Sequence, residues 1–164
     1  MSLFENDEYR WRDTYFVLFE SQSRPHAVGV EAALREMDRR YQLVDVRQNE
    51  DGMFESLTLL SPDDNTAMDI TFMSGEEVAE SLVELNTELK KTTLDPDQQE
   101  KAVQLAGCDA RFDVFHFERL TFEFDESEEE EDEFMDPGAL LIVLERMAEI
   151  CQGVAVDPAS NSLL

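Results

Sequence analysis

Positive charge is scarce in this sequence. Its 164 residues include 13 Lys and Arg against 39 Asp and Glu, which gives a formal net charge of −26 at pH 7. Proteins that bind nucleic acids or anionic membrane surfaces need clustered Lys or Arg, so the composition argues against both kinds of partner. An acidic surface instead suits a basic protein or a divalent cation.

Long apolar runs are also missing. The longest, residues 14–19 and 139–144, are far shorter than the roughly 20 residues that a membrane-spanning helix needs. Residues 1–13 are rich in charge and lack the basic start and apolar stretch of a signal peptide. We therefore expect a cytoplasmic protein with no membrane partner.

Cysteine is limited to Cys108 and Cys151. Their separation matches neither a zinc site nor a CxxC redox motif, so we expect no metal site and no cofactor. Cys151 falls on the apolar face of a predicted helix, where a free Cys behaves as a small buried hydrophobe. A disulfide between the two is not expected in a reducing compartment.

The residues that are present favour one folded domain. Hydrophobic residues make up 42% of the chain and include eleven Phe, so a core can form despite the charge.

In the predicted strand 41–48, we expect Val44 and Val46 on one face and Tyr41 and Leu43 on the other. Gly52 supplies the positive φ for the hairpin turn that follows. The predicted strands cover residues 14–20, 41–48, 53–60, 68–72 and 154–156, together with a stretch that begins at Arg111.

Helices are predicted from apolar spacing and from start signals. We expect Ser74 and Glu77 to form a capping box for the helix that buries Val78, Leu82, Leu85 and Leu89. Asp95, followed by Pro96, predicts the start of a second, shorter helix that ends near Ala106. The predicted helices cover residues 26–40, 74–91, 95–106 and 138–152. In the last of these the expected apolar face comprises Leu140, Leu141, Leu144, Met147, Ala148 and Cys151.

The resulting order is β-α-β-β-β-α-(α)-β-α-β, which predicts an α+β fold with a mainly antiparallel sheet and helices packed on it. This order resembles the ferredoxin-like, or split βαβ, pattern with one additional strand and an appended helix-strand unit. The expected organisation is a polar N-terminal arm over residues 1–13, one α+β domain over 14–157 with an acidic loop at 125–133, and a tail over 158–164.

The most distinctive stretch is residues 111–134. Phe112, Val114, Leu120, Phe122 and Phe124 alternate as in a strand with one buried face. A nearly pure acidic run, residues 125–133, follows at once. Removing its eight acids would still leave a net charge of about −18, so the acidity extends over the whole chain.

Three readings of the acidic run remain open. The run could be a solvated loop, it could attract a basic protein or imitate a nucleic-acid backbone, or it could hold Ca²⁺ or Mg²⁺ loosely. An EF-hand calcium loop needs a central Gly, which this run lacks. We therefore weigh the first two readings above the third.

No catalytic set stands out, and three residues are weak candidates. His116 and Glu118 project from one strand face, where a base and an orienting carboxylate could meet a substrate. Cys108 could supply a nucleophile to such an imidazole. The alternative for His116 is a structural role on a partly exposed sheet face.

The leading hypothesis is a non-enzymatic protein-interaction or regulatory module for a basic partner, either a monomer or a weak dimer. The alternative is a small enzyme or ligand-binding domain with its site near His116 and Glu118. The N-terminal Arg10, Trp11 and Arg12 combine charge with an aromatic ring, as binding hot spots do, although an arm folded onto its own acidic body explains them equally well. The predicted partner-binding residues are Glu128, Glu129, Glu130, Glu131, Asp132, Glu133, Arg10, Trp11 and Arg12.

Overall fold

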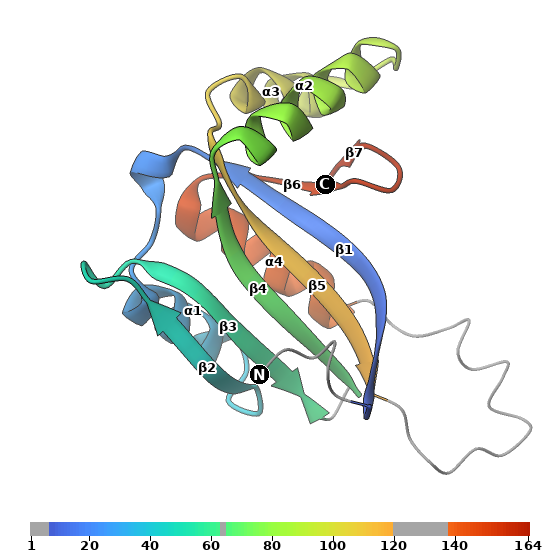
Figure 1. Cartoon of the computed structure of the whole chain (residues 1–164). Coiled ribbons are helices and arrows are strands. Elements are labelled where there is room, and N and C mark those ends of the chain that lie inside the picture. Colours follow the sequence, from blue (N-terminus) through green and yellow to red (C-terminus); the bar gives the residue numbers. More distant parts are fainter. Residues whose placement is uncertain (1–6, 63–64, 120–137) are drawn as a thin grey trace, which may run out of the picture.

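The computed structural model describes residues 7–62, 65–119 and 138–164, and these form one seven-stranded antiparallel sheet with four α-helices (Figure 1). The order of strands across the sheet is β2-β3-β4-β5-β1-β6-β7. The elements are β1 (Tyr9–Phe19), a short 3₁₀ helix (Ser21–Ser23), α1 (Ala27–Met37), β2 (Gln42–Gln48), β3 (Phe54–Ser61), β4 (Thr66–Ser74), α2 (Glu76–Lys90), α3 (Pro96–Leu105), β5 (Ala110–Arg119), α4 (Gly138–Cys151), β6 (Val154–Asp157) and β7 (Ser162–Leu163).

Helices α1 and α4 cover one face of the sheet, behind the strands in Figure 1. Val30 and Leu34 of α1 and Leu144 of α4 join a buried cluster with Phe112 and Met68 of the central strands. The ring of Phe112 lies 4.6 Å from that of Phe19 and 5.5 Å from that of Phe54, measured between centroids. This cluster of aromatic and aliphatic side chains is the main core.

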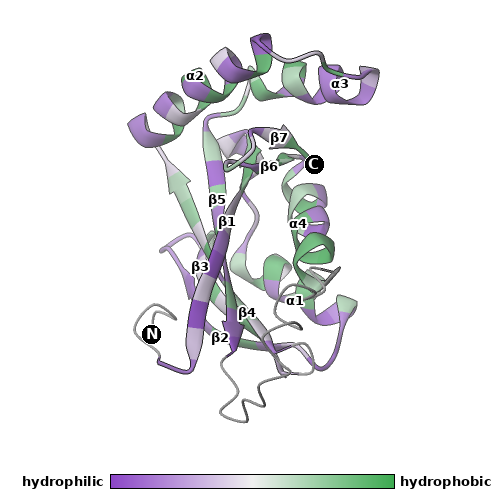
Figure 2. Ribbon diagram, turned by 90° about the vertical axis from the view of Figure 1, so that its right-hand side faces the viewer, coloured by the Kyte–Doolittle hydropathy of each residue, from purple (hydrophilic) through white to green (hydrophobic). Residues whose placement is uncertain are grey.

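Helices α2 and α3 lie across one end of the sheet, as the side view shows (Figure 2). Leu18 points away from Val17 and Phe19 because successive strand residues face opposite sides. It packs with Val78 and Leu82 of α2, Leu105 of α3 and Val156 of β6 in a second core cluster. The predicted stripe of α2 is confirmed, since Val78, Leu82, Leu85 and Leu89 are all buried.

The predicted α+β class with an antiparallel sheet is confirmed. Strands β5 and β6 both run antiparallel to β1 and flank it, so they are parallel to each other with β1 between them. Helix α4 lies on the connection between β5 and β6, so a helix joins these two parallel strands. The wider resemblance to a ferredoxin-like fold stays a prediction.

The first and last described segments of the chain contain more strand than expected. Strand β1 begins at Tyr9, so residues 9–13, predicted to lie in a polar arm, pair with β5 instead. The pairing shifts register between Trp11 and Asp13, which marks a β-bulge. Leu163 in the predicted tail pairs with Val156 as part of β7.

A bulge also changes the predicted faces of β2. The β2–β3 register shifts between Val44 and Arg47, and Asp45 has a left-handed φ of 51°. The added residue turns Val46 to the same side as Leu43, and both pack against the main core, while Val44 is 38% exposed. The prediction that Val44 and Val46 share a face is therefore wrong.

The two predicted helix starts have different outcomes. Ser74 belongs to β4, and the N-cap of α2 is Gly75, which has a φ of 100°. No side chain caps the start of this helix, so the predicted Ser74–Glu77 capping box is wrong. At α3, the Asp95 side chain accepts from the Gln98 amide at 2.8 Å and the Gln98 side chain accepts from the Asp95 amide at 3.3 Å. The start predicted at Asp95 is confirmed and has both halves of a capping box.

Helix α4 is rotated relative to its predicted apolar face. Val143 is fully buried, whereas Leu141 is 45% exposed. Leu140, Leu144 and Met147 reach the main core as predicted. Leu120, Phe122, Phe124 and the acidic run 125–133 lie outside the described residues.

Candidate functional site

His116 lies in the middle of a hydrogen-bonded chain on strand β5. Its Nδ1 is 2.9 Å from Oδ1 of Asp13 on β1, and Oδ2 of Asp13 accepts from the Tyr15 hydroxyl at 3.2 Å. The imidazole is 4% exposed, and β1 and β4 flank it in the sheet. The carboxylate that orients His116 is therefore Asp13, which the sequence analysis missed because the partner depends on strand register.

Glu118 is held by two arginines, and among the described residues it forms no hydrogen bond with His116. Its Oε2 accepts from Arg10 at 2.7 Å and from Arg12 at 3.1 Å. The carboxylate is nearly buried, and both arginines come from β1, the next strand in the sheet. The two candidates thus share a strand face but belong to separate polar groups, one around Asp13 and one around the arginines.

Cys108 does not meet His116. It precedes β5, which starts at Ala110, and the six further strand residues to His116 span roughly 20 Å at about 3.3 Å each. Burial, and then the nearby charges of Glu20 and Asp109, raise the pKa of the Cys108 thiol to about 11. A buried protonated thiol far from an imidazole is not an activated nucleophile.

Trp11 presents its ring to solvent beside the two arginines. The side chain is 49% exposed, and its Nε1 donates to the Thr14 hydroxyl at 3.1 Å. Because Arg10 and Arg12 are bonded to Glu118, they meet an acidic residue of the same chain, as the folded-back interpretation expected. The other predicted partner-binding residues, in the acidic run, lie outside the described residues.

A buried ion pair links the sheet to α2. Arg111 Nε donates to Asp113 at 2.7 Å, Arg111 Nη1 donates to the Ser81 hydroxyl at 2.6 Å, and the guanidinium lies 4.2 Å from the centroid of the Phe16 ring. Burial raises the pKa of Asp113, although Arg111 beside it acts in the opposite direction. This group makes structural contacts, and alternation alone did not reveal it.

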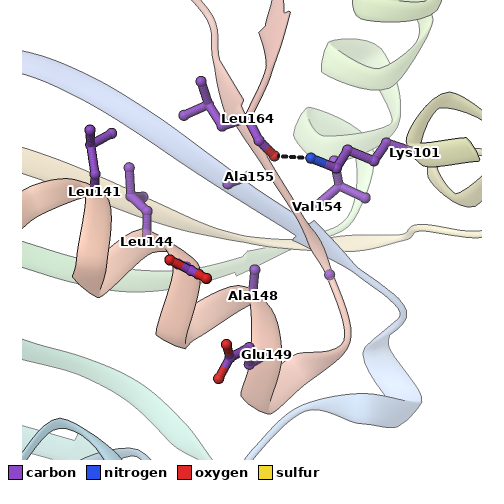
Figure 3. Close-up of a pocket in the computed structure, with 10 residues that line it drawn as sticks. Lys101, Leu141, Leu144, Ala148, Glu149, Val154, Ala155 and Leu164 are labelled. Carbon is purple, nitrogen blue, oxygen red and sulfur yellow. Dashed lines mark hydrogen bonds between the residues drawn. The ribbon is translucent and has the colours of Figure 1, made fainter. Parts of the chain in front are cut away.

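A cavity of about 470 Å³ lies between α4 and β6, and we call it the α4–β6 groove (Figure 3). Most of its wall is apolar. Leu141 and Leu164, at its rim, are 45% and 42% exposed. Figure 3 shows side chains of α4 facing β6 and the end of the chain across this space. The apolar wall comprises Leu141, Leu144, Ala148, Val154, Ala155 and Leu164.

Carboxylates rim the groove. The Glu145 side chain makes no hydrogen bond or ion pair with any residue that the structure describes, and the Glu149 side chain bonds only Arg146, at 3.2 Å, within that same set. Arg146 also donates to Glu36 of α1 at 3.1 Å. Lys101 lies at the other end, where its Nζ donates to the Leu164 main-chain oxygen at 2.5 Å.

A second cavity of about 470 Å³ lies on the other side of α4, toward α1. Its wall includes Met37 and Ile142, and it shares Glu145 and Glu149 with the first. Helix α4 therefore presents exposed apolar side chains, Leu141 and Ile142, with acidic residues close to both. Helical spacing alone did not predict this surface, because it placed Leu141 on the apolar face of the helix.

Neither a metal-binding cluster among the described residues nor a known relative points to a function. Among residues 7–62, 65–119 and 138–164, no group of His, Cys, Asp and Glu side chains has the arrangement of a metal site. Within the same residues no helix has the length and apolar character that a membrane span requires. No protein-family model matches the chain, and neither a curated protein nor a solved structure does.

Proposed function

We propose that this chain is a non-enzymatic protein-binding domain whose acidic surface attracts a basic partner. The observation that supports this most is how the charged side chains are distributed. Arg111, Arg10, Arg12 and Arg146 all bond carboxylates of the same chain. The few cations therefore do little to neutralise the carboxylates that remain at the surface.

Helix α2 illustrates the surplus of exposed carboxylates. Glu76, Glu80 and Glu84 are exposed and form no ion pair with any described residue. A field of one sign accelerates association with a partner of the opposite sign and repels nucleic acid and anionic lipid. The run of acids from Glu128 to Glu133 adds to the same field. Trp11 supplies an exposed aromatic ring that a partner can cover.

The enzymatic alternative has less support. A base needs access to a substrate, whereas His116 is buried and bonded to Asp13. The described cavities beside α4, and a smaller one between β1 and α2, are lined by other residues. We therefore do not assign a reaction to His116 and Glu118.

The proposal is tested by affinity capture at increasing salt. The immobilised full-length chain is incubated with a lysate of the cells that express it, and bound proteins are identified by mass spectrometry. We expect partners with basic segments that dissociate as NaCl rises from about 0.1 to 1 M, because the Debye length falls from about 10 to 3 Å.

A variant with Glu76, Glu80 and Glu84 changed to Gln tests the same claim, because it removes three charges and no described ion pair. It should release the same partners at lower salt. Partners that stay bound regardless of salt, or a captured set of acidic proteins, would contradict the proposal.

A further inference from the structure

We infer that the α4–β6 groove binds a partner segment in which an apolar side chain is flanked by Lys or Arg. This inference rests on the proposed function and adds the binding surface and the chemistry of the segment. Three observations support it. These are the exposed apolar side chains of the groove, the carboxylates beside them, and the negative charge of the two other candidates for the groove, a second copy of the chain and its own acidic run.

Two apolar side chains of the wall, Leu141 and Leu164, are exposed and belong to neither core cluster. Helix α4 already supplies Leu140, Val143 and Met147 to the core, yet Leu141 remains 45% exposed at the groove. Leu164 faces the same space and is 42% exposed. A cavity of about 470 Å³ lies within the usual range of roughly 300–1,000 Å³ for ligand sites, and covering its wall removes apolar surface from water.

The carboxylates favour a cation at the same place. Leu141, Glu145 and Glu149 follow one another at intervals of four residues, so they lie along one side of α4, about 6 Å apart. Like charges at this spacing repel each other, and a Lys or Arg between them relieves the repulsion. Arg146 pairs with Glu149 at 3.2 Å and the Lys101 ammonium bonds Leu164, so among the described residues Glu145 is the rim carboxylate without a cation.

Charge also favours a basic partner segment over the two other candidates for the groove, a second copy of the chain and the acidic run of the same chain. A second copy of the chain carries a net charge of −26, and the run of acids at residues 125–133 has the same sign as the rim. Both would bring like charges together, whereas a Lys- or Arg-flanked apolar residue matches both the wall and the rim.

The test uses two fluorescent peptides and four variants of the full-length chain. One peptide carries Leu flanked by Lys on both sides, and the other has Ser in place of Leu. Leu141→Ser is matched by Val83→Ser, an exposed apolar site on α2, and Glu145→Gln is matched by Glu80→Gln, an exposed acid on α2. Each pair has the same change in charge, and thermal melts verify that all four variants fold.

Fluorescence anisotropy should give a clear order of affinities. We expect Leu141→Ser to weaken binding of the Leu peptide about tenfold and Val83→Ser less than about twofold. Glu145→Gln should weaken it about threefold, more than Glu80→Gln does. Peptide-induced amide shifts in NMR spectra should concentrate on α4 and β6.

Other outcomes separate the two proposals. Equal affinity for both peptides, or equal effects of each matched pair, would overturn the groove and leave the basic-partner proposal standing. Self-association of the free chain that Leu141→Ser abolishes would show a second copy in the groove and would overturn this inference. If neither peptide binds even at low salt, both proposals are contradicted.

Discussion

The pair of Arg111 and Asp113 shows how single residues hold the second layer in place. A buried ion pair costs solvation free energy, and it persists here because Ser81 and the Phe16 ring satisfy the guanidinium. Burial is the dominant influence on Asp113, since its pKa is raised despite the adjacent cation. Each partner therefore makes the burial of the other tolerable.

Replacing Arg111 by Met should lower the free energy of unfolding by about 3 kcal/mol, because Asp113 is left buried without its partner. The loss should shrink as the pH falls, since without Arg111 the carboxyl takes up a proton more readily in the folded state than in the unfolded state. Urea denaturation measures both effects. Adding Asp113→Leu should recover most of the loss, and a double variant no better than the single one would contradict this account.

Tyr15 makes stability depend on alkaline pH. Burial, and then the Asp13 carboxylate, raise the pKa of Tyr15 to about 12 from 10.0. As the pH rises above 10, the unfolded chain loses this proton while the folded chain keeps it, so stability falls toward pH 12. Tyr15→Phe should lose less stability than the parent between about pH 10 and 12 in urea titrations. Parallel curves would contradict the prediction.

Residue partners were the least predictable feature. The alternation of β5 correctly placed His116 on the same face as Phe112 and Val114, but Asp13 and His116 are far apart in the sequence. Their contact requires the β1–β5 register, which includes a bulge after Trp11. Local patterns contain no information on that register.

At the scale of elements, helix α3 depends on its first turn. The Asp95–Gln98 capping box satisfies amides that would otherwise lack partners, and α3 contributes Leu105 to the second core. Asp95 was predictable as a start because Pro96 follows it. The Ser74–Glu77 pair matched the same pattern and failed because β4 continues through Ser74.

Asp95→Ala should destabilise the protein by about 1 kcal/mol, the usual cost of removing an N-cap. Asp97→Ala is the matched control, because Asp97 lies in the first turn and accepts no cap hydrogen bond. Asp97→Ala should lower the free energy of unfolding by less than about 0.5 kcal/mol, because it removes only the interaction of one negative charge with the helix dipole. Chemical denaturation compares the two, and equal losses would mean that charge rather than capping matters at this end.

At the scale of the molecule, the sequence predicted the class of fold but not the order of the sheet. Alternation and helical spacing are local, so they identified most strands and helices. The placement of β1 between β5 and β6 depends on contacts between opposite ends of the chain. The exposure of Leu141 likewise depends on how α4 sits against β1 and α1, which decides which side chains reach the core.

The net charge should also make folding depend on salt. At −26 the folded chain repels itself more strongly than the expanded unfolded chain does. Raising NaCl from about 0.02 to 0.5 M should therefore raise the melting temperature, since screening weakens the repulsion. KCl should act alike, because the effect comes from ionic strength. A melting temperature that stays constant or falls would contradict this expectation.

The most direct test of the central claim is the association rate of a basic partner at different ionic strengths. Stopped-flow fluorescence with the Leu peptide flanked by Lys measures association and dissociation separately. If the acidic surface steers the partner, the association rate constant should fall at least about tenfold between 0.05 and 0.5 M NaCl, with a smaller change in dissociation. An association rate constant that does not change with salt would contradict the claim.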